Sequence, residues 1–473
     1  MSGMKGRIGL LAGVALLALT PVGAMAQSSK QTEMEARLKA LEESVGALRA
    51  ELDAERARNA ELKQNQQQTE QKVQAIQTAA ATPPPPPPAP ADGFKVGGTT
   101  VKLNGFIKTN AMFSRWDDGD VAGNTLGRDF YLPQSIPVGG VRESTDFDFS
   151  GKQTRVWLTT STPIGKHKLG GHIEFDFQTA AGTQGSERTT NGYNLALRRG
   201  FITFDNLLAG QEWSNFQYTG ALPESTDFVG VTEGTVFVRQ PQVRYTKKLG
   251  ENAALLFSVE NPETATATPT SAALTEQDDD RIPDFTARLL LKPSFGELSL
   301  AGVVRQLSVD NGTLSARGTG WGISGAGKVP FGPDKRHNVS FMATYGSGIG
   351  RYVGLNFAPD AIVYVPTGGG LDLAKVKTFA GFAAARIGLT PNLRTNLMYS
   401  MQNVDYPTAY RPVGANESAW SAAANIFWSP VKGFDIGAEY RHGVREIWVL
   451  SGGLPTTASG QLDRVEFAFK YSF

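Results

Sequence analysis

The 473-residue sequence contains no cysteine and only four histidines. The absence of cysteine excludes disulfide bridges and thiolate metal sites, and it suits a protein exported into an oxidising periplasm. A strong charge of either sign is also missing: the formal net charge is +1, which argues against a nucleic-acid partner. The four histidines are scattered, and neither an HExxH nor a GxSxG motif occurs. We therefore predict no enzymatic activity, no metal and no cofactor.

Long apolar runs are absent except at the N-terminus. Lys5 and Arg7 precede the apolar run 8–19 and the small-residue sequence 24–26, a pattern that predicts a secretory signal peptide over residues 1–26. No other stretch approaches 18 continuous apolar residues, the length that a transmembrane helix needs. If the mature chain spans a membrane, it must do so as a closed β-barrel.

Residues 27–79 carry a heptad repeat that predicts a coiled-coil stalk. From Met34 onward two core positions recur every seven residues, and apolar side chains such as Leu38, Leu41 and Leu48 dominate them. No other face is apolar, so a lone helix would have nothing to cover this stripe. We predict a parallel coiled coil about 70 Å long at ~1.5 Å per residue, with a single marginal helix as the alternative. Residues 80–92, which include six consecutive prolines, follow as a stiff linker.

From residue 93 to residue 473 the periodicity changes to two, which is typical of β-strands with one apolar face. Seven short turns with Pro, Gly or Asn alternate with eight long polar segments, which predicts sixteen antiparallel strands. This alternation is the signature of an outer-membrane barrel, and a soluble β-sandwich has no reason to maintain it. A barrel of this size leaves an aqueous channel. The long segments are 117–144, 180–192, 214–236, 262–280, 309–316, 349–370, 405–417 and 445–460.

The C-terminal stretch 462–473 is the most regular of these strands. Its apolar face carries Val465, Phe467, Phe469, Tyr471 and Phe473, and its other face carries small or polar residues. Such an aromatic face would promote aggregation in water, whereas in a bilayer it is the lipid side of a barrel. Ending on phenylalanine, the stretch resembles the strand by which outer-membrane barrels are recognised for assembly.

Arginines gather on the strand faces that we assign to the lumen. A guanidinium group matches the geometry of a carboxylate or phosphate, so arginines on a lumen wall favour an anion pathway. The alternative is that each arginine pairs with a lumen acid and braces the wall. The predicted pathway residues are Arg155, Arg198, Arg244, Arg288, Arg305, Arg386 and Arg394, with Arg441 and Arg464 on the same side. The lumen acids are fewer: Glu174, Asp176, Asp284, Glu439 and Glu466.

The long segment 214–236 follows the fifth predicted strand. In sixteen-stranded porins the loop at this place folds inward and narrows the pore. The segment contains Glu224, Asp227 and Glu233 but no lysine or arginine. We therefore predict a constriction loop whose acids lie opposite the arginine wall and set a transverse field.

Several motifs resemble the DcaP-like porin family. They are Leu208–Phe216 (LAGQEWSNF), Pro223–Phe228 (PESTDF), Arg239–Tyr245 (RQPQVRY), Ser347–Tyr352 (SGIGRY) and Ile436–Tyr440 (IGAEY), the last followed by Arg445-Glu446. The order of stalk, proline linker and barrel is similar too, and only Gly200-Phe201 departs from the Ala-Tyr pair expected there. The resemblance covers residues 27–473. It implies a trimeric outer-membrane channel that passes small anions such as dicarboxylates.

The sequence thus predicts an all-β chain: a transmembrane antiparallel β-barrel of about 16 strands, preceded by a periplasmic α-helical coiled coil. The predicted function is passive diffusion of small anionic solutes across the bacterial outer membrane, where lipid and lipopolysaccharide surround a homotrimer. One alternative is a channel for sugars or neutral solutes. Such a channel would need a row of aromatic side chains along the lumen, and Trp157 and Trp213 are too few to form one. Another is a barrel that anchors a tether between the outer membrane and the cell wall.

Overall fold

The computed structural model of the protein describes residues 46, 49–50, 52–64, 66–69, 93–179 and 190–473. The chain divides into two compact units, Met1–Pro88 and Ala89–Phe473. The described residues of the first unit are helical and exposed. Within the described residues no helix is both long and apolar enough to cross a membrane. The predicted signal peptide, the proline linker and much of the predicted stalk lie outside the described residues.

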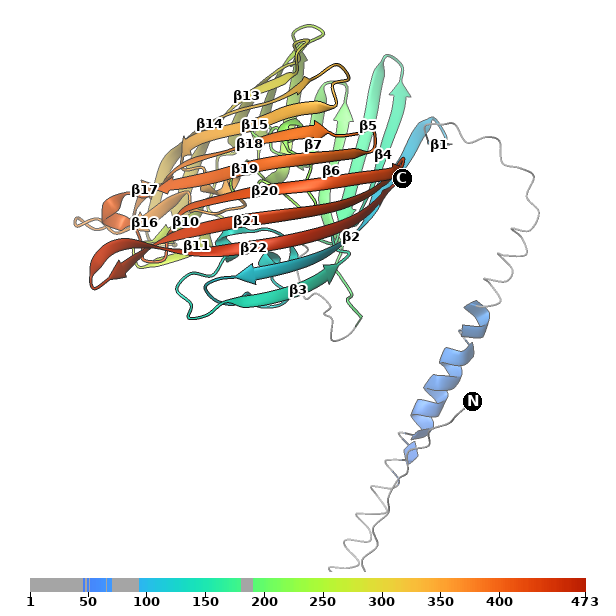
Figure 1. The fold of residues 1–473 in the computed structure, drawn as a ribbon, viewed down its shortest axis with the longest axis horizontal. Helices are drawn as coiled ribbons and strands as arrows, with labels where there is room; N and C mark the ends of the chain where they lie inside the picture. The colour runs from blue at the N-terminus through green and yellow to red at the C-terminus, as the bar shows by residue number, and fades with distance from the viewer. Residues whose placement is uncertain (1–45, 47–48, 51, 65, 70–92, 180–189) are drawn as a thin grey trace, which may run out of the picture. The chain divides into compact units, whose positions relative to one another are not determined.

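The second unit is a closed antiparallel barrel of sixteen spans (Figure 1). One sheet holds eighteen strands, of which β1 (Phe94–Val96) is a short hairpin partner and β3 and β4 are two halves of one span, because both pair with β2. The barrel closes where the first span pairs with the last, β2 with β22. The other strands are β2 (Thr99–Trp116), β3 (Ser144–Ser150), β4 (Arg155–Ile164), β5 (His167–Asp176), β6 (Ala196–Phe204), β7 (Leu207–Trp213), β8 (Arg239–Lys248), β9 (Ala253–Glu260), β12 (Asp284–Leu291), β13 (Glu297–Asp310), β14 (Ser315–Phe331), β15 (His337–Ser347), β18 (Lys377–Gly388), β19 (Leu393–Asp405), β20 (Asn416–Val431), β21 (Phe434–Ser451) and β22 (Leu454–Ser472).

The period-two pattern of each span separates an outer apolar face from an inner face. On β22, Phe467 and Phe469 are 42% and 47% exposed, whereas Glu466 and Ala468, which alternate with them, are each 2% exposed. Such alternation places apolar side chains against lipid and leaves polar side chains for the interior. The predicted closed barrel of sixteen spans is confirmed. Short and long connections alternate except between β13 and β14 and between β21 and β22, where the expected long segment is itself a short turn.

Some strands extend further toward the long-loop end than the sequence pattern predicted. Residues 445–460, expected to be a long polar loop, continue β21 to Ser451 and begin β22 at Leu454, leaving only Gly452 and Gly453 as the turn. Both glycines have positive φ, at 58° and 80°, which glycine adopts without a steric cost. The expectation was wrong because a strand beyond the membrane has water on its faces. It therefore loses the apolar alternation while its backbone pairing persists.

Five of the long loops carry short elements of their own in the described residues. The first contains α2 (Leu126–Asp129) and η1 (Pro133–Ser135). The fourth and sixth contribute β10 (Ala265–Thr268), β11 (Ser271–Glu276), β16 (Ala361–Tyr364) and β17 (Asp372–Lys375), which form a separate four-stranded sheet in the order β11-β10-β16-β17. The remaining short helical turns are η2 (Thr219–Ala221), η3 (Gly350–Tyr352) and η4 (Thr408–Tyr410). Loops from different hairpins thus pack on one another at the long-loop end of the barrel.

The closing seam yields a prediction about Phe473. Its backbone N–H donates to Gly105 O and its carbonyl accepts from Gly105 N, both at 3.0 Å, so the last residue completes the pairing of β22 with β2. We expect Phe473→Ser to lower the amount of folded barrel in the outer membrane while synthesis of the chain is unchanged, because an aromatic contact at the seam is lost. Heat-modifiable mobility of membrane fractions measures this. Wild-type levels of the heat-modifiable form would contradict it.

Candidate solute pathway through the barrel

The loop between β7 and β8, residues 214–238, lies inside the barrel. Its ends meet where Ser214 N donates to Val238 O at 3.0 Å, and its apolar residues, among them Phe216 and Val236, pack on inward-facing wall residues. It reaches distant spans: Thr226 O accepts from Lys108 Nζ on β2 at 2.6 Å, and Gly234 N donates to Ser400 Oγ on β19 at 2.9 Å. A loop held on both sides in this way narrows the channel.

The three acids of this loop all take part in holding it. Glu224 accepts two hydrogen bonds from Arg394, at 2.7 Å from Nε and 2.5 Å from Nη2. Asp227 accepts from the backbone N–H groups of Val229 and Gly230, both at 2.9 Å, and so closes a tight turn. Glu233 is fully buried beside the hydroxyl group of Tyr131, at 3.3 Å. These contacts anchor the loop, and they leave Glu224 as the one acid of the three with substantial exposure, at 29%.

Two of the predicted pathway arginines brace the wall beside β5. The guanidinium group of Arg198 donates to Glu174 at 2.9 Å and to Asp176 at 2.5 Å, and its side chain is 2% exposed. Arg155 also donates to Asp176, at 3.2 Å, and retains 21% exposure. Because charged pairs that are removed from water need their partners, this cluster is a structural unit first. Only Arg155 presents part of its charge to the lumen.

Arg305 is the centre of a second buried network. Its side chain is fully buried and lies 3.3 Å from Asp284 and 2.9 Å from Asp360. Tyr352, on the sixth long loop, donates to Asp284 at 2.6 Å. Burial, together with the Asp284 carboxylate, raises the pKa of Tyr352 well above its ordinary range, so the hydroxyl remains a donor. In this structure Arg305 joins that loop to the wall and does not line open lumen.

Of the remaining predicted arginines, some are held by hydrogen-bond or salt-bridge partners and one is partly exposed. Arg441 pairs with Glu439 at 2.8 Å, and Arg464 donates to Ser114 Oγ at 2.9 Å and to a backbone carbonyl. Arg386 lies 3.8 Å from Glu224, and its side chain is 38% exposed. Arg394 is the main partner of the same carboxylate. The predicted set therefore does not act as one continuous cationic wall.

The interior contains more acids than the sequence pattern assigned to it. Glu212, Glu260 and Asp435 face inward from strands, and Asp360 comes from a loop, so the predicted excess of lumen arginines over acids was overstated. Asp360 could not be found from strand alternation because it lies on a connection. Although acids are numerous, no group of three or more His, Asp or Glu side chains in the described part of the chain is placed to hold a metal ion.

Three half-buried arginines on β8 and β12 keep their charge unpaired. Across the described residues, no carboxylate lies within salt-bridge distance of Arg239, Arg244 or Arg288. Arg288 donates to the carbonyl of Gln217 at 2.6 Å, and Arg239 stacks over the ring of Trp213 at 5.0 Å. The sequence analysis did not select Arg239, because strict alternation assigns it to the outer face. The pattern breaks there because β8 begins directly after the inward loop.

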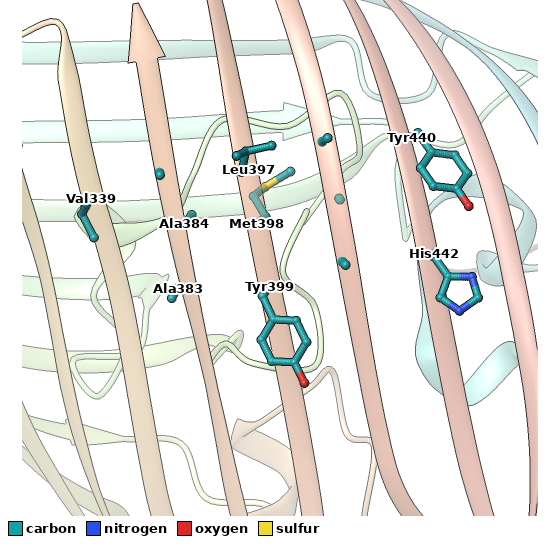
Figure 2. Close-up of a pocket in the computed structure, with 12 residues that line it drawn as sticks. Val339, Ala383, Ala384, Leu397, Met398, Tyr399, Tyr440 and His442 are labelled. Atoms are coloured by element: carbon teal, nitrogen blue, oxygen red, sulfur yellow. The ribbon is translucent and has the colours of Figure 1, made fainter.

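A recess of about 550 Å³ lies elsewhere, on the outer face of β15 to β21 (Figure 2). Alanines such as Ala383 on neighbouring strands form its floor, and Tyr399 and Tyr440 flank it, with 47% and 49% exposure. His442 and Tyr440 both hydrogen-bond Asp463, at 2.9 and 2.7 Å. Its lining is apolar and turned away from the lumen, so we exclude it from the solute pathway.

Comparisons with known proteins agree with this architecture. The sequence profile of the family described as DcaP outer membrane protein matches residues 29–473. The crystal structure of the outer membrane channel DcaP of Acinetobacter baumannii is similar, with 27% identity and a TM-score of 0.62, over 81% of this chain and 100% of that one. OmpT of Vibrio cholerae, folded in vitro, has 12% identity and a TM-score of 0.48, over 81% and 100%. None of the curated proteins compared with the chain matches it.

The buried network around Arg305 yields a prediction about stability. Arg305→Met removes the cation that Asp360 pairs with and leaves Asp284 with Arg351 alone, 3.6 Å away, and breaking a buried pair in this way costs roughly 3–5 kcal/mol. We expect a clear fall in the temperature at which the barrel loses its heat-modifiable form. Arg244→Met is the matched control, since no carboxylate of the described residues pairs with Arg244, and its loss should leave that temperature unchanged. Equal stability of both variants would show that the network does not hold the loop.

Proposed function

The chain belongs to the DcaP outer membrane protein family and is an outer membrane channel, and we propose that it passes small anions such as dicarboxylates by passive diffusion. A channel of this kind needs fixed positive charge that the protein itself does not neutralise. It also needs that charge where the lumen is narrow, because field strength falls as water and salt screen it.

The observation that carries the proposal is a set of three arginines without a salt bridge, Arg239, Arg244 and Arg288. Their side chains are half-buried, they lie next to the loop that narrows the barrel, and the described residues supply them with no carboxylate partner. On β8, Val243 and Tyr245 are 52% and 49% exposed on the outer face, which directs Arg244 between them to the interior. Of the two carboxylates on neighbouring strands, Glu212 is bound by Arg199 at 2.6 Å and Glu260 accepts hydrogen bonds from neutral donors such as Gln240. The charges of Arg244 and Arg288 therefore remain available to attract an anion.

Arg155 and Arg386 add further positive charge to the proposed pathway. Both retain partial exposure, although each has an acid nearby. Arg198 and Arg305 are left out of the proposed pathway because their guanidinium groups are buried among carboxylates. We therefore infer a pathway in which β8 and β12 attract anions most strongly and Arg155 and Arg386 attract them more weakly.

We also propose that the chain forms a homotrimer whose N-terminal stalk, residues 27–79, lies in the periplasm. The short turns would face the periplasm and the long loops the exterior, as is usual for outer-membrane barrels. Support comes from the first unit alone: Leu52 and Leu62 occupy predicted seam positions and are 50% and 61% exposed in the single chain. An apolar seam that a helix cannot cover by itself favours association with other copies.

Replacement of Arg244 tests the proposed pathway. Two charges ~4 Å apart interact by about 1 kcal/mol in bulk water and by about 4 kcal/mol at an effective dielectric near 20, and a narrow aqueous pore lies between these limits. Arg244→Ala should therefore weaken anion occupancy roughly tenfold, lower dicarboxylate flux and move the reversal potential toward zero. Flux into liposomes and the reversal potential in planar bilayers measure both effects.

The controls separate charge from fold. Arg244→Lys should lose less, because the charge remains while the bidentate geometry does not. Arg317→Ala removes an exposed arginine that alternation places on the outer face of β14 and should leave both quantities unchanged. If correctly folded Arg244→Ala retains wild-type flux and selectivity, Arg244 does not belong to the pathway.

A further inference from the structure

Four aromatic side chains on neighbouring spans form a row along the inner wall of the barrel. From β2, β4, β5 and β6 in turn, they are Phe106, Trp157, His172 and Phe201. A residue adjacent to each of them in the chain lies on the outer face and is 39–59% exposed: Ile107, Val156, Ile173 and Ile202. Because successive side chains of a strand point to opposite faces, the four rings point into the barrel. We call them the aromatic row.

The rings of the aromatic row contact one another in pairs and remain accessible. Phe106 and Trp157 meet edge to face, with ring centres 6.4 Å apart. His172 and Phe201 lie directly opposite each other on β5 and β6 and are stacked, with ring centres 5.1 Å apart. All four side chains are only half-buried. Since they lie on the inner face, the exposed part of each ring is open to a solute in the lumen.

The aromatic row lies on the short-turn side of the inward loop. Lys108, two residues beyond Phe106 on β2, donates to Thr226 O of that loop at 2.6 Å. His172 and Phe201 lie near the ends of β5 and β6 that join short turns. A solute that enters from the long-loop end therefore meets the row after it has passed the loop.

Two cationic groups flank the first pair of rings. The guanidinium carbon of Arg155 lies 5.4 Å from the centre of the Phe106 ring, and Lys470 Nζ lies 5.8 Å from the same centre. Both cations have a carboxylate partner, yet their side chains retain 21% and 33% exposure. Arg155 and Trp157 are two residues apart on one face of β4, a spacing of about 6.6 Å. One small solute can therefore contact a ring and a cation together.

We propose that the aromatic row binds aromatic carboxylates. The solute ring packs against Trp157 and Phe106, and its carboxylate meets Arg155 and Lys470. This proposal rests on the proposed function, because such a solute reaches the row through an anion-conducting lumen. It adds a preference that charge alone does not produce, since two aromatic rings attract each other beyond the burial of their apolar area. A sugar could also pack on these rings, but it offers the two cations no charge.

Benzoate and cyclohexanecarboxylate are suitable probes because both carry one negative charge at neutral pH and a six-membered ring, and only benzoate is aromatic. In planar bilayers with the full-length protein, each anion is added on the side of the short turns. The concentration that halves the KCl current is measured. Contact between aromatic rings corresponds to about a two- to tenfold gain in affinity, so benzoate should act at a concentration lower by that factor.

Trp157→Leu keeps an apolar side chain and removes the ring. It should abolish the preference for benzoate and leave the value for cyclohexanecarboxylate unchanged. Trp428→Leu is the matched control, because Trp428 lies on the outer face of β20 with 47% exposure and should affect neither anion. If Trp157→Leu does not assemble, the comparison of the two anions on the wild type still decides.

Equal values for the two anions on the wild type, or a benzoate preference that persists in folded Trp157→Leu, would overturn the proposed binding site. An anion-selective reversal potential in KCl would then leave the proposed function standing. A reduction of the current by D-glucose that Trp157→Leu removes would assign the row to sugars and overturn the carboxylate proposal. A cation-selective wild type would overturn the proposed function and the binding site together.

Discussion

The structure depends on one constraint: a backbone polar group that faces lipid must find its partner within the protein. The pairing of β2 with β22 satisfies this constraint for the whole sheet, because it removes the two edges that an open sheet would expose. The alternating faces of the spans follow from closure, since one side of every strand must then meet lipid and the other the interior. The polar interior in turn makes ionic networks and a solute pathway feasible.

Inside the barrel, desolvation decides what each arginine can do. Where water is excluded, a guanidinium group must pair with carboxylates. Arg198 pairs in this way with the wall at β5, and Arg305 joins the sixth long loop to the wall through Asp360. Where water remains, Arg244 and Arg288 keep a charge that no acid of the described residues neutralises. The same residue type therefore has two roles, and burial separates them.

Much of the barrel could be predicted from the sequence because a period of two and regular turns are local signals. The inward direction of Arg244 followed from the same alternation. The inward position of the loop that carries Glu224 was expected because the loop after the fifth strand folds inward in sixteen-stranded porins. The salt-bridge partner of each arginine could not be predicted in this way. Arg305 pairs with Asp360, which lies on a loop that is distant in sequence and has no periodic pattern. Arg239 was missed because alternation fails where β8 leaves the inward loop. Sequence patterns thus identify faces, and tertiary packing decides which charges on those faces remain available.

The central claim is that unpaired arginines make this outer membrane channel selective for anions. The most direct measurement is the reversal potential of the purified protein in a planar bilayer under a KCl gradient. The charge distribution predicts a potential of the sign set by chloride, and its magnitude should fall when salt on both sides is raised, because mobile ions screen the fixed charges. A potential of the sign set by potassium would contradict the account.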